Sequence, residues 1–428
     1  MLAVAATVRA AVPLTAFAVT GSADSFLTPD SAEYLDLARS LADGRGYSDA
    51  SGPHLRRPPG YPLLLVPGVA LGAPVAWAAA LQAALGACTV LLVFTIARTL
   101  IGSGWALLPA ILCTLDPVLV AWTPRVMAEA ALTFAVALAL AAALSYVVRP
   151  RAPAAVAAGL ALAGAAFMKP VALVLIPVLG VALAWGVARV GRSERLRHAA
   201  ALLLAGLLPL AAWQLRNARA AGYAGFSTQA DGFLSLALPA GVIARTEGRP
   251  FTAVRKELDA GRDAFRRNRD GLRALAEHPV TTVVVVAEGA LRTLAAPGAL
   301  PLVELLGGGA VSLELSQPAV DHGAARGLAV RLAHGGPILA LTLGLGLVHG
   351  AVLLLAARGA LRCPAGPRTV LLAFVACFVL LSAGAWGQSR FRSAAVPALC
   401  LLAGCGIAGA RGGGTGILTR LGWRRSSS

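Results

Sequence analysis

The sequence predicts an all-α protein that crosses a membrane many times. Its 428 residues are 57% apolar and 13% charged, whereas soluble domains are about 45–50% apolar and about 25% charged. The mean hydropathy of +0.74 excludes a soluble globular enzyme and a disordered chain. The net charge of +17 comes from basic residues scattered between apolar runs, which suits loops beside membrane lipids and argues against a nucleic-acid partner.

Apolar runs long enough to cross a bilayer core of ~30 Å recur along the chain. They predict about ten transmembrane helices, within a range of about 9–12. The predicted spans lie near residues 2–20, 73–98, 104–121, 126–148, 152–168, 170–189, 197–216, 334–357, 369–386 and 394–410. We interpret the first span as an uncleaved anchor, because no basic segment precedes it and further spans follow.

Arginines follow every second predicted span, and the positive-inside rule assigns such loops to the cytoplasm. The clusters lie at Arg98, at 149–151, at 189–197, at 358–368 and in the tail from residue 411. This assignment predicts a multi-pass protein of a bacterial cytoplasmic membrane with both termini in the cytoplasm. Of the 20 acidic residues, only Glu194 then lies on the cytoplasmic side. Any carboxylate chemistry is therefore expected on the external face.

The same pattern predicts four regions. Residues 1–216 form an N-terminal membrane module with a first external loop at 21–72, and 217–333 form an external or interfacial segment that is partly helical. Residues 334–410 form C-terminal transmembrane helices, and 411–428 form a basic, flexible cytoplasmic tail. Within the external segment, 251–277 resemble one polar helix, and we interpret 280–297 as an interfacial or re-entrant helix rather than a span.

The first external loop carries the most informative pattern. Thr28 and Pro29 are typical of a helix N-terminus, and apolar residues then recur at helical spacing from Tyr34 to Leu41. Such a helix would lie flat at the membrane surface and hold Asp30 at the edge of the bilayer. Asp30 is either a catalytic acid or a residue that complements the helix dipole. Glu33 and Tyr34 are candidates for acceptor contacts or for structural roles.

Further charged residues are expected on the same membrane face. Arg57 precedes a proline, so its backbone is stiff, and its guanidinium either binds a phosphate or anchors the chain beside Tyr61. Glu129 is a functional candidate or the partner of Arg125 on one helix, and Asp116 is left undecided before a proline.

Three more cations complete the set. Lys169 either binds a phosphate or snorkels to the interface. Arg390 and Arg392 flank an aromatic residue and either hold an anionic headgroup or anchor the last span. Together, acids and cations on one face suit the transfer of a group from a lipid-linked phosphate.

The order of these motifs resembles the bacterial family 39 glycosyltransferases, relatives of the protein O-mannosyltransferases and aminoarabinose–lipid A transferases. The residues that carry the resemblance are Asp30 to Tyr47, Arg57 to Leu65, the Glu129 helix start, 166–170, and Arg390 to Arg392. The resemblance covers residues 1 to about 216 and returns near 334–410. It implies the membrane GT-C fold and an inverting transfer from a polyprenyl-phosphate sugar to an acceptor hydroxyl.

The resemblance also implies roles for individual residues. Asp30 would deprotonate the acceptor, and Glu129 would act as a second acid near the reacting sugar. The lipid phosphate would be received by the cations Arg57, Lys169, Arg390 and Arg392. Many relatives carry Asp-Glu where this chain has Asp30-Ser31, and no Asp-x-Asp occurs. We therefore expect no metal ligands and no firm cofactor, although a divalent cation stays open.

Two other classes remain as alternatives. A transporter or lipid-linked sugar flippase would carry charges near the bilayer midplane and often shows inverted repeats. An O-antigen ligase-like or polymerase-like enzyme would have a large external loop but would lack the early acid followed by Arg-Pro-Pro. The acceptor is unknown and could be a glycan, a lipid, a protein or a small molecule.

Overall fold

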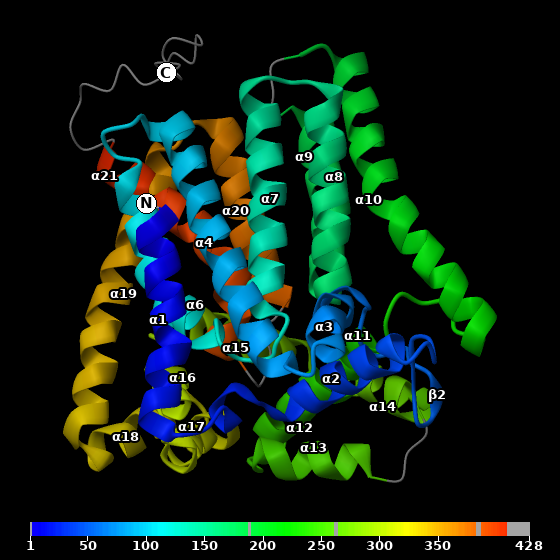
Figure 1. Ribbon diagram of the computed structural model, residues 1–428. Coiled ribbons are helices and arrows are strands. Elements are labelled where there is room, and N and C mark those ends of the chain that lie inside the picture. The colour runs from blue at the N-terminus through cyan, green and yellow to red at the C-terminus, as the bar shows by residue number, and fades with distance from the viewer. Residues whose placement is uncertain (1, 187–189, 261–263, 382–386, 409–428) are drawn as a thin grey trace.

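The computed structural model describes residues 2–186, 190–260, 264–381 and 387–408 (Figure 1). The predicted tail 411–428 lies outside the described residues. The first half contains α1 (Leu2–Thr20), α2 (Pro29–Ala42), α3 (Gly60–Ala70), α4 (Pro74–Ile101), α5 (Leu107–Leu115), α6 (Pro117–Trp122), α7 (Glu129–Val148), α8 (Ala152–Met168), α9 (Leu175–Trp185) and α10 (Arg192–Ala221). A two-stranded antiparallel hairpin, β1 (Ser48–Asp49) and β2 (Gly52–Pro53), lies between α2 and α3.

The second half is also helical. It contains α11 (Gln229–Gly232), α12 (Leu238–Glu247), α13 (Phe251–Asp259), α14 (Ala264–Glu277), α15 (Pro279–Ala295), α16 (Ala299–Leu305), α17 (Gly309–His322), α18 (Ala324–His334), α19 (Gly336–Arg362), α20 (Ala365–Leu381) and α21 (Val396–Ala408). Short helices of other types occur at η1 (Asp24–Phe26), η2 (Pro170–Val174), η3 (Phe233–Ala237) and η4 (Ser389–Ala395).

The predicted all-α polytopic membrane fold is confirmed. Among the described residues, six helical stretches are long and apolar enough to cross a membrane: α1, α4, α7, α10, α19 and Ser389–Ala408. Three more predicted spans form the shorter apolar helices α8, Pro170–Trp185 and α20. These helices stand side by side in one bundle (Figure 1).

The predicted span at 104–121 is wrong as a single helix. Asp116 breaks it, because its Oδ1 accepts hydrogen bonds from the N–H groups of Val118 and Leu119 at 3.0 Å each and so caps α6. The α1 helix reaches this break through Arg9, which is 1% exposed. Arg9 donates to the carbonyl oxygen of Cys113 at 2.9 Å and to Thr123 Oγ1 at 3.1 Å, on either side of the break.

Two glycines set the spacing of the pair α19 and α21. A Cβ at Gly359 would overlap the carbonyl oxygen of Leu402, and a Cβ at Gly406 would overlap that of Leu355. Small residues let helix backbones approach closely within a membrane, where the hydrophobic effect does not drive helices together. The two helices therefore pack backbone against backbone.

The elements between the spans gather at one end of the bundle. Figure 1 shows α2, α12, α13 and α16–α18 at its lower end. The predicted single helix at 251–277 is wrong, because α13 ends at Asp259 and α14 follows as a separate helix. The stretch Arg269–Glu277 meets α15 at an angle of 98°, so the chain turns sharply where we expected an interfacial or re-entrant helix.

Candidate active site

The N-terminus of α2 is fixed to the segment that precedes α7. Pro29 is the first helical residue and Thr28 is the N-cap, as predicted. The Thr28 N–H donates to Ser31 Oγ at 2.9 Å, and Ser31 Oγ donates to the carbonyl oxygen of Val126 at 2.8 Å. Since Ser31 is completely buried, this contact places Asp30 at a defined distance from the start of α7.

The predicted apolar face of α2 packs against protein. Tyr34, Leu37 and Ala38 are each at most 1% exposed. The ring of Tyr34 meets the ring of Tyr61 in α3 edge-on, with centroids 4.9 Å apart. Tyr61 is itself buried and donates from its hydroxyl to Gln82 Oε1 at 3.3 Å. Tyr61 thus connects Tyr34 of α2 to Gln82 of α4.

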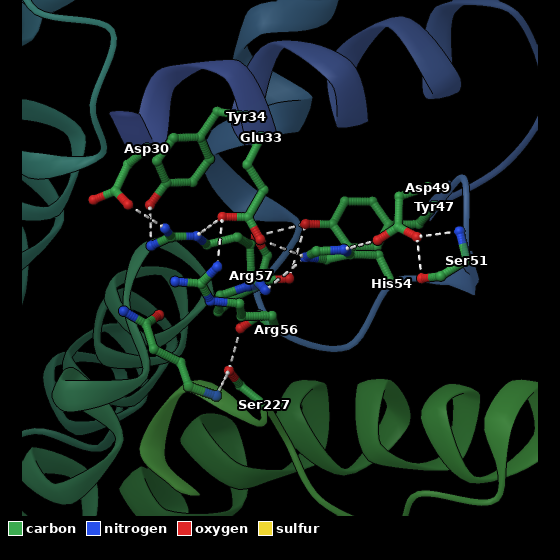
Figure 2. Close-up of polar contacts among 12 residues, drawn as sticks. Asp30, Glu33, Tyr34, Tyr47, Asp49, Ser51, His54, Arg56, Arg57 and Ser227 are labelled. Atoms are coloured by element: carbon green, nitrogen blue, oxygen red, sulfur yellow. Dashed lines mark hydrogen bonds and ion pairs between the residues drawn. The ribbon is translucent and has the colours of Figure 1, made fainter. Parts of the chain in front are cut away.

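Arg57 contacts two acids of α2, Asp30 and Glu33 (Figure 2). Its Nη2 donates to Asp30 Oδ1 at 2.7 Å, and its Nε donates to Glu33 Oε2 at 2.7 Å. The guanidinium also lies 4.9 Å from the centroid of the Tyr34 ring. Arg57 is only 3% exposed. Its charge is therefore committed to these two carboxylates, one helical turn apart.

Glu129 and Lys169 form a separate ion pair. Lys169 Nζ lies 2.6 Å from Glu129 Oε1, and the Glu129 side chain is 1% exposed. The alternative partner Arg125 is not paired with Glu129. Arg125 contacts Glu304 Oε2 at 3.2 Å instead and stacks over the Trp122 ring.

Arg390 lies between the ion pairs of Arg57 and the Lys169–Glu129 pair. We call these residues the Asp30 cluster: Asp30, Glu33, Arg57, Glu129, Lys169 and Arg390. Its Nη1 lies 3.8 Å from Asp30 Oδ2, and its guanidinium stands 5.6 Å from the Trp122 ring. Glu129 also interacts electrostatically with Arg390, and Asp30 with Lys169. The Nε of Arg390 is buried and has no hydrogen-bond partner among the described residues. Arg390 is thus the cation of the cluster with the most unused hydrogen-bonding capacity.

The cations keep Asp30 ionised. Burial raises the pKa of Asp30. The charges of Arg57 and Arg390, together with the hydrogen bond from Arg57, lower this pKa by more than burial raises it. The net effect is a pKa below the usual value for an aspartate. Asp30 is consequently a carboxylate at neutral pH, in the form that accepts a proton or orients a hydroxyl.

Two predicted residues lie outside this cluster. Arg392 is fully buried and donates to the carbonyl oxygens of Thr293 and Ala296 at the C-terminal end of α15. Asp116 caps α6, as described above. The structure therefore gives Arg392 and Asp116 contacts with backbone groups rather than with the Asp30 cluster.

Sequence analysis missed several residues around Arg57. Tyr47, Asp49 and His54 form hydrogen bonds beside it in the hairpin region (Figure 2). A histidine five residues after an acid in a polar loop was the only available signal for the Asp49–His54 pair. Within the described residues, no group of three or more His, Cys, Asp or Glu could hold a metal ion.

One protein family matches part of the chain by sequence. Residues 56–213 match the sequence profile of the dolichyl-phosphate-mannose-protein mannosyltransferase family. This match confirms the predicted resemblance to the protein O-mannosyltransferases over residues 56–213. The part of this chain that matches includes Arg57, Glu129 and Lys169, whereas Asp30 and Arg390 lie outside it. Membership of family 39 and a bacterial origin remain predictions. No curated protein matches the chain.

Solved structures confirm the predicted GT-C fold. One is the oligosaccharyltransferase AglB from Archaeoglobus fulgidus in complex with an inhibitory peptide and a dolichol-phosphate, with a TM-score of 0.54 and 14% sequence identity. A structure of the Archaeoglobus fulgidus oligosaccharyltransferase with Zn and sulfate gives a TM-score of 0.51 at 15% identity. Each alignment covers 94% of this chain, and the chain spans about half the length of those proteins, 49% and 48%.

Proposed function

We propose that the protein is an integral-membrane glycosyltransferase that moves a sugar from a polyprenyl-phosphate donor to an acceptor hydroxyl. The observation that carries this proposal is the position of Asp30, ionised between Arg57 and Arg390. The match to a mannosyltransferase family and the dolichol-phosphate bound to AglB support it. By the arginine distribution, we infer that the site faces the external side of a cytoplasmic membrane.

The proposed reaction is a direct displacement. The acceptor hydroxyl gives its proton to the Asp30 carboxylate while its oxygen bonds to the anomeric carbon of the sugar. The bond between that carbon and the phosphate oxygen breaks, and the polyprenyl phosphate leaves with the electron pair. Attack opposite the leaving group inverts the anomeric configuration.

The contacts of the cations suggest a separate task for each. Arg57 is held by Asp30 and Glu33, so we assign to it the orientation of the catalytic carboxylate. Lys169 is held by Glu129, and this pair borders the reacting sugar. Arg390 is 20% exposed in its side chain and has an unused buried N–H group, so we assign to it the main contact with the leaving phosphate.

The test is sugar transfer in purified membranes with a panel of radiolabelled polyprenyl-phosphate sugars. Wild type is compared with Asp30→Asn and with the control Asp36→Asn. Asp36 is an exposed acid on the same helix, and among the described residues its ion-pair partner is Arg39. We expect Asp30→Asn to lose transfer by about 10²–10⁴-fold, the usual contribution of a general base. Asp36→Asn should transfer as wild type does.

Two results would contradict the proposal. Equal transfer by Asp30→Asn and wild type would make Asp30 a helix-terminal acid only. Export of an intact lipid-linked sugar without consumption of any donor would favour a flippase.

A further inference from the structure

The backbone of Arg57 is held by two side chains that the proposed reaction does not use (Figure 2). The Arg57 N–H donates to His54 Nε2 at 2.9 Å. The Tyr47 hydroxyl bonds to the carbonyl oxygens of Arg57 and Pro58 at 2.8 and 3.0 Å. Both polar groups of the Arg57 backbone are thus bound to side chains instead of to regular secondary structure.

His54 is oriented by an acid on its other side. Its Nδ1 lies 2.6 Å from Asp49 Oδ2, and its side chain is 6% exposed. Because Nε2 accepts the Arg57 N–H, the ring hydrogen of a neutral imidazole is on Nδ1 and is donated to Asp49. Asp49 in turn accepts from the Ser51 N–H at 2.8 Å across the tip of the hairpin.

We propose that His54 is a positioning residue that, when neutral, fixes Arg57 and thereby the carboxylate of Asp30. The inference rests on the proposed function, because the position of Asp30 affects a rate only if Asp30 takes part in transfer. The guanidinium of Arg57 meets Asp30 and Glu33 at 2.7 Å each. A displacement of its backbone by about 1 Å is enough to lose a geometry of this kind.

Protonation of His54 would reverse its contact with Arg57. A proton on Nε2 makes that nitrogen a donor, which cannot accept the Arg57 N–H. Glu33 Oε1 is 3.5 Å from His54 Nε2 and would then attract the imidazolium away from the Arg57 N–H. Protonation of His54 should therefore loosen Arg57 from Asp30.

The other groups that face His54 are charged or phenolic. Asp49 on β1 lies 2.6 Å from His54 Nδ1, and Glu33 on α2 lies 3.5 Å from His54 Nε2. Arg216 on α10 donates to the carbonyl oxygens of His54 and Tyr47 at 3.1 and 2.6 Å. The rings of Tyr47 and His54 meet edge-on at 5.7 Å.

Two substitutions separate positioning from simple packing. His54→Gln keeps an amide oxygen that can accept the Arg57 N–H but cannot titrate in this range. His54→Phe keeps a ring of similar size but has no acceptor. His334→Gln is the matched control, because His334 is exposed at the end of α18.

Transfer rates are measured from pH 8 to pH 5.5. We expect the wild-type kcat to fall on acidification, and the Asp30 carboxylate cannot cause this fall because its pKa is lowered. His54→Gln should keep kcat within about threefold of wild type at pH 8 and lose the acid fall, whereas His54→Phe should lose about 10–100-fold in kcat with little change in KM. His334→Gln should match wild type. An unchanged acid fall in His54→Gln would overturn the inference.

Hydrogen–deuterium exchange gives a readout that does not depend on activity. In the peptide 53–59, the first two residues lose their label by back-exchange and Pro58 and Pro59 carry no amide hydrogen, so the Arg57 amide is one of three that report, with those of Leu55 and Arg56. At one fixed pH, exchange should be faster in His54→Phe than in wild type and His54→Gln. Equal exchange in all three proteins would overturn the inference. Faster exchange in His54→Phe, with no transfer by wild type, would sustain the positioning of Arg57 and refute the proposed function.

Discussion

Lys169 Nζ lies 2.6 Å from Glu129 Oε1, although 40 positions separate the two residues. Glu129 is the first residue of α7, and Lys169 directly follows the last residue of α8. Since consecutive helices joined by a short loop run antiparallel, the end of α8 returns to the level at which α7 begins. The ion pair therefore ties the two helix ends together beside Asp30.

Removing one member of this pair should destabilise the protein more than removing both. We expect Glu129→Gln or Lys169→Met alone to cost about 3–5 kcal/mol, because the remaining charge is buried without its partner. The double variant should recover most of that loss. Thermal unfolding of the four proteins in detergent measures the coupling, and additive losses would show that the pair is not an energetic unit.

Arg390 and Arg392 should differ in what their loss changes. Arg390→Met should weaken binding of a polyprenyl phosphate by about 10–100-fold, since a hydrogen bond to a charged group is worth about 1.5–3 kcal/mol. Arg392→Met should leave that affinity nearly unchanged and lower the thermal stability, because Arg392 binds carbonyl groups of α15. Titration of each variant with the lipid phosphate distinguishes them; equal losses of affinity would place both cations at the phosphate.

The first external loop should lose stability in acid. The hydrogen bonds from His54 and then Ser51 lower the pKa of Asp49 to about 2, and the pKa of Asp30 is also lowered. An unfolded aspartate has a pKa of about 3.9, so both acids stabilise the fold above that value. This contribution is lost as the pH falls from about 4 towards 2. Limited proteolysis of the 21–72 loop should thus accelerate below pH 4, and less so in Asp49→Asn.

Glycine substitutions on α19 should reveal the close approach to α21. A Cβ at Gly359 overlaps the Leu402 carbonyl oxygen, whereas a Cβ at Gly344 on the same helix meets nothing within 4 Å. Gly359→Ala should cost about 1–3 kcal/mol, the usual range for overpacking. Gly344→Ala should be neutral or slightly stabilising. Equal thermal midpoints for the two variants would contradict backbone-to-backbone packing.

The sequence predicted the spans and α2 well because each has a local signal. Apolar runs mark membrane helices regardless of their neighbours, and Thr28-Pro29 marks a helix start from its own chemistry. The break at Asp116 was not predicted, because one capping residue changes the mean hydropathy of an apolar run very little. Elements between spans, such as α13 and α14, carry weaker signals because their polar residues suit both helix and loop.

The pairing of the site residues was harder to predict than their identity. Arg125 was considered a partner of Glu129 because four positions separate neighbours on one helix face. That rule does not apply here, since α7 begins at Glu129 and Arg125 precedes it in a non-helical segment. Contacts such as Arg57 with Glu33, or Lys169 with Glu129, depend on how separate helices pack, which no local pattern encodes.

Apart from the exposed Arg56, the cluster balances three carboxylates against three cations: Asp30, Glu33 and Glu129 with Arg57, Lys169 and Arg390. A neutral site exerts little net attraction on an anion, so it recognises a phosphate through directed hydrogen bonds and not through bulk charge. In the proposed reaction, the released lipid phosphate carries more negative charge than the phosphodiester donor. A balanced site therefore favours turnover, because it does not trap the product that each catalytic cycle must release.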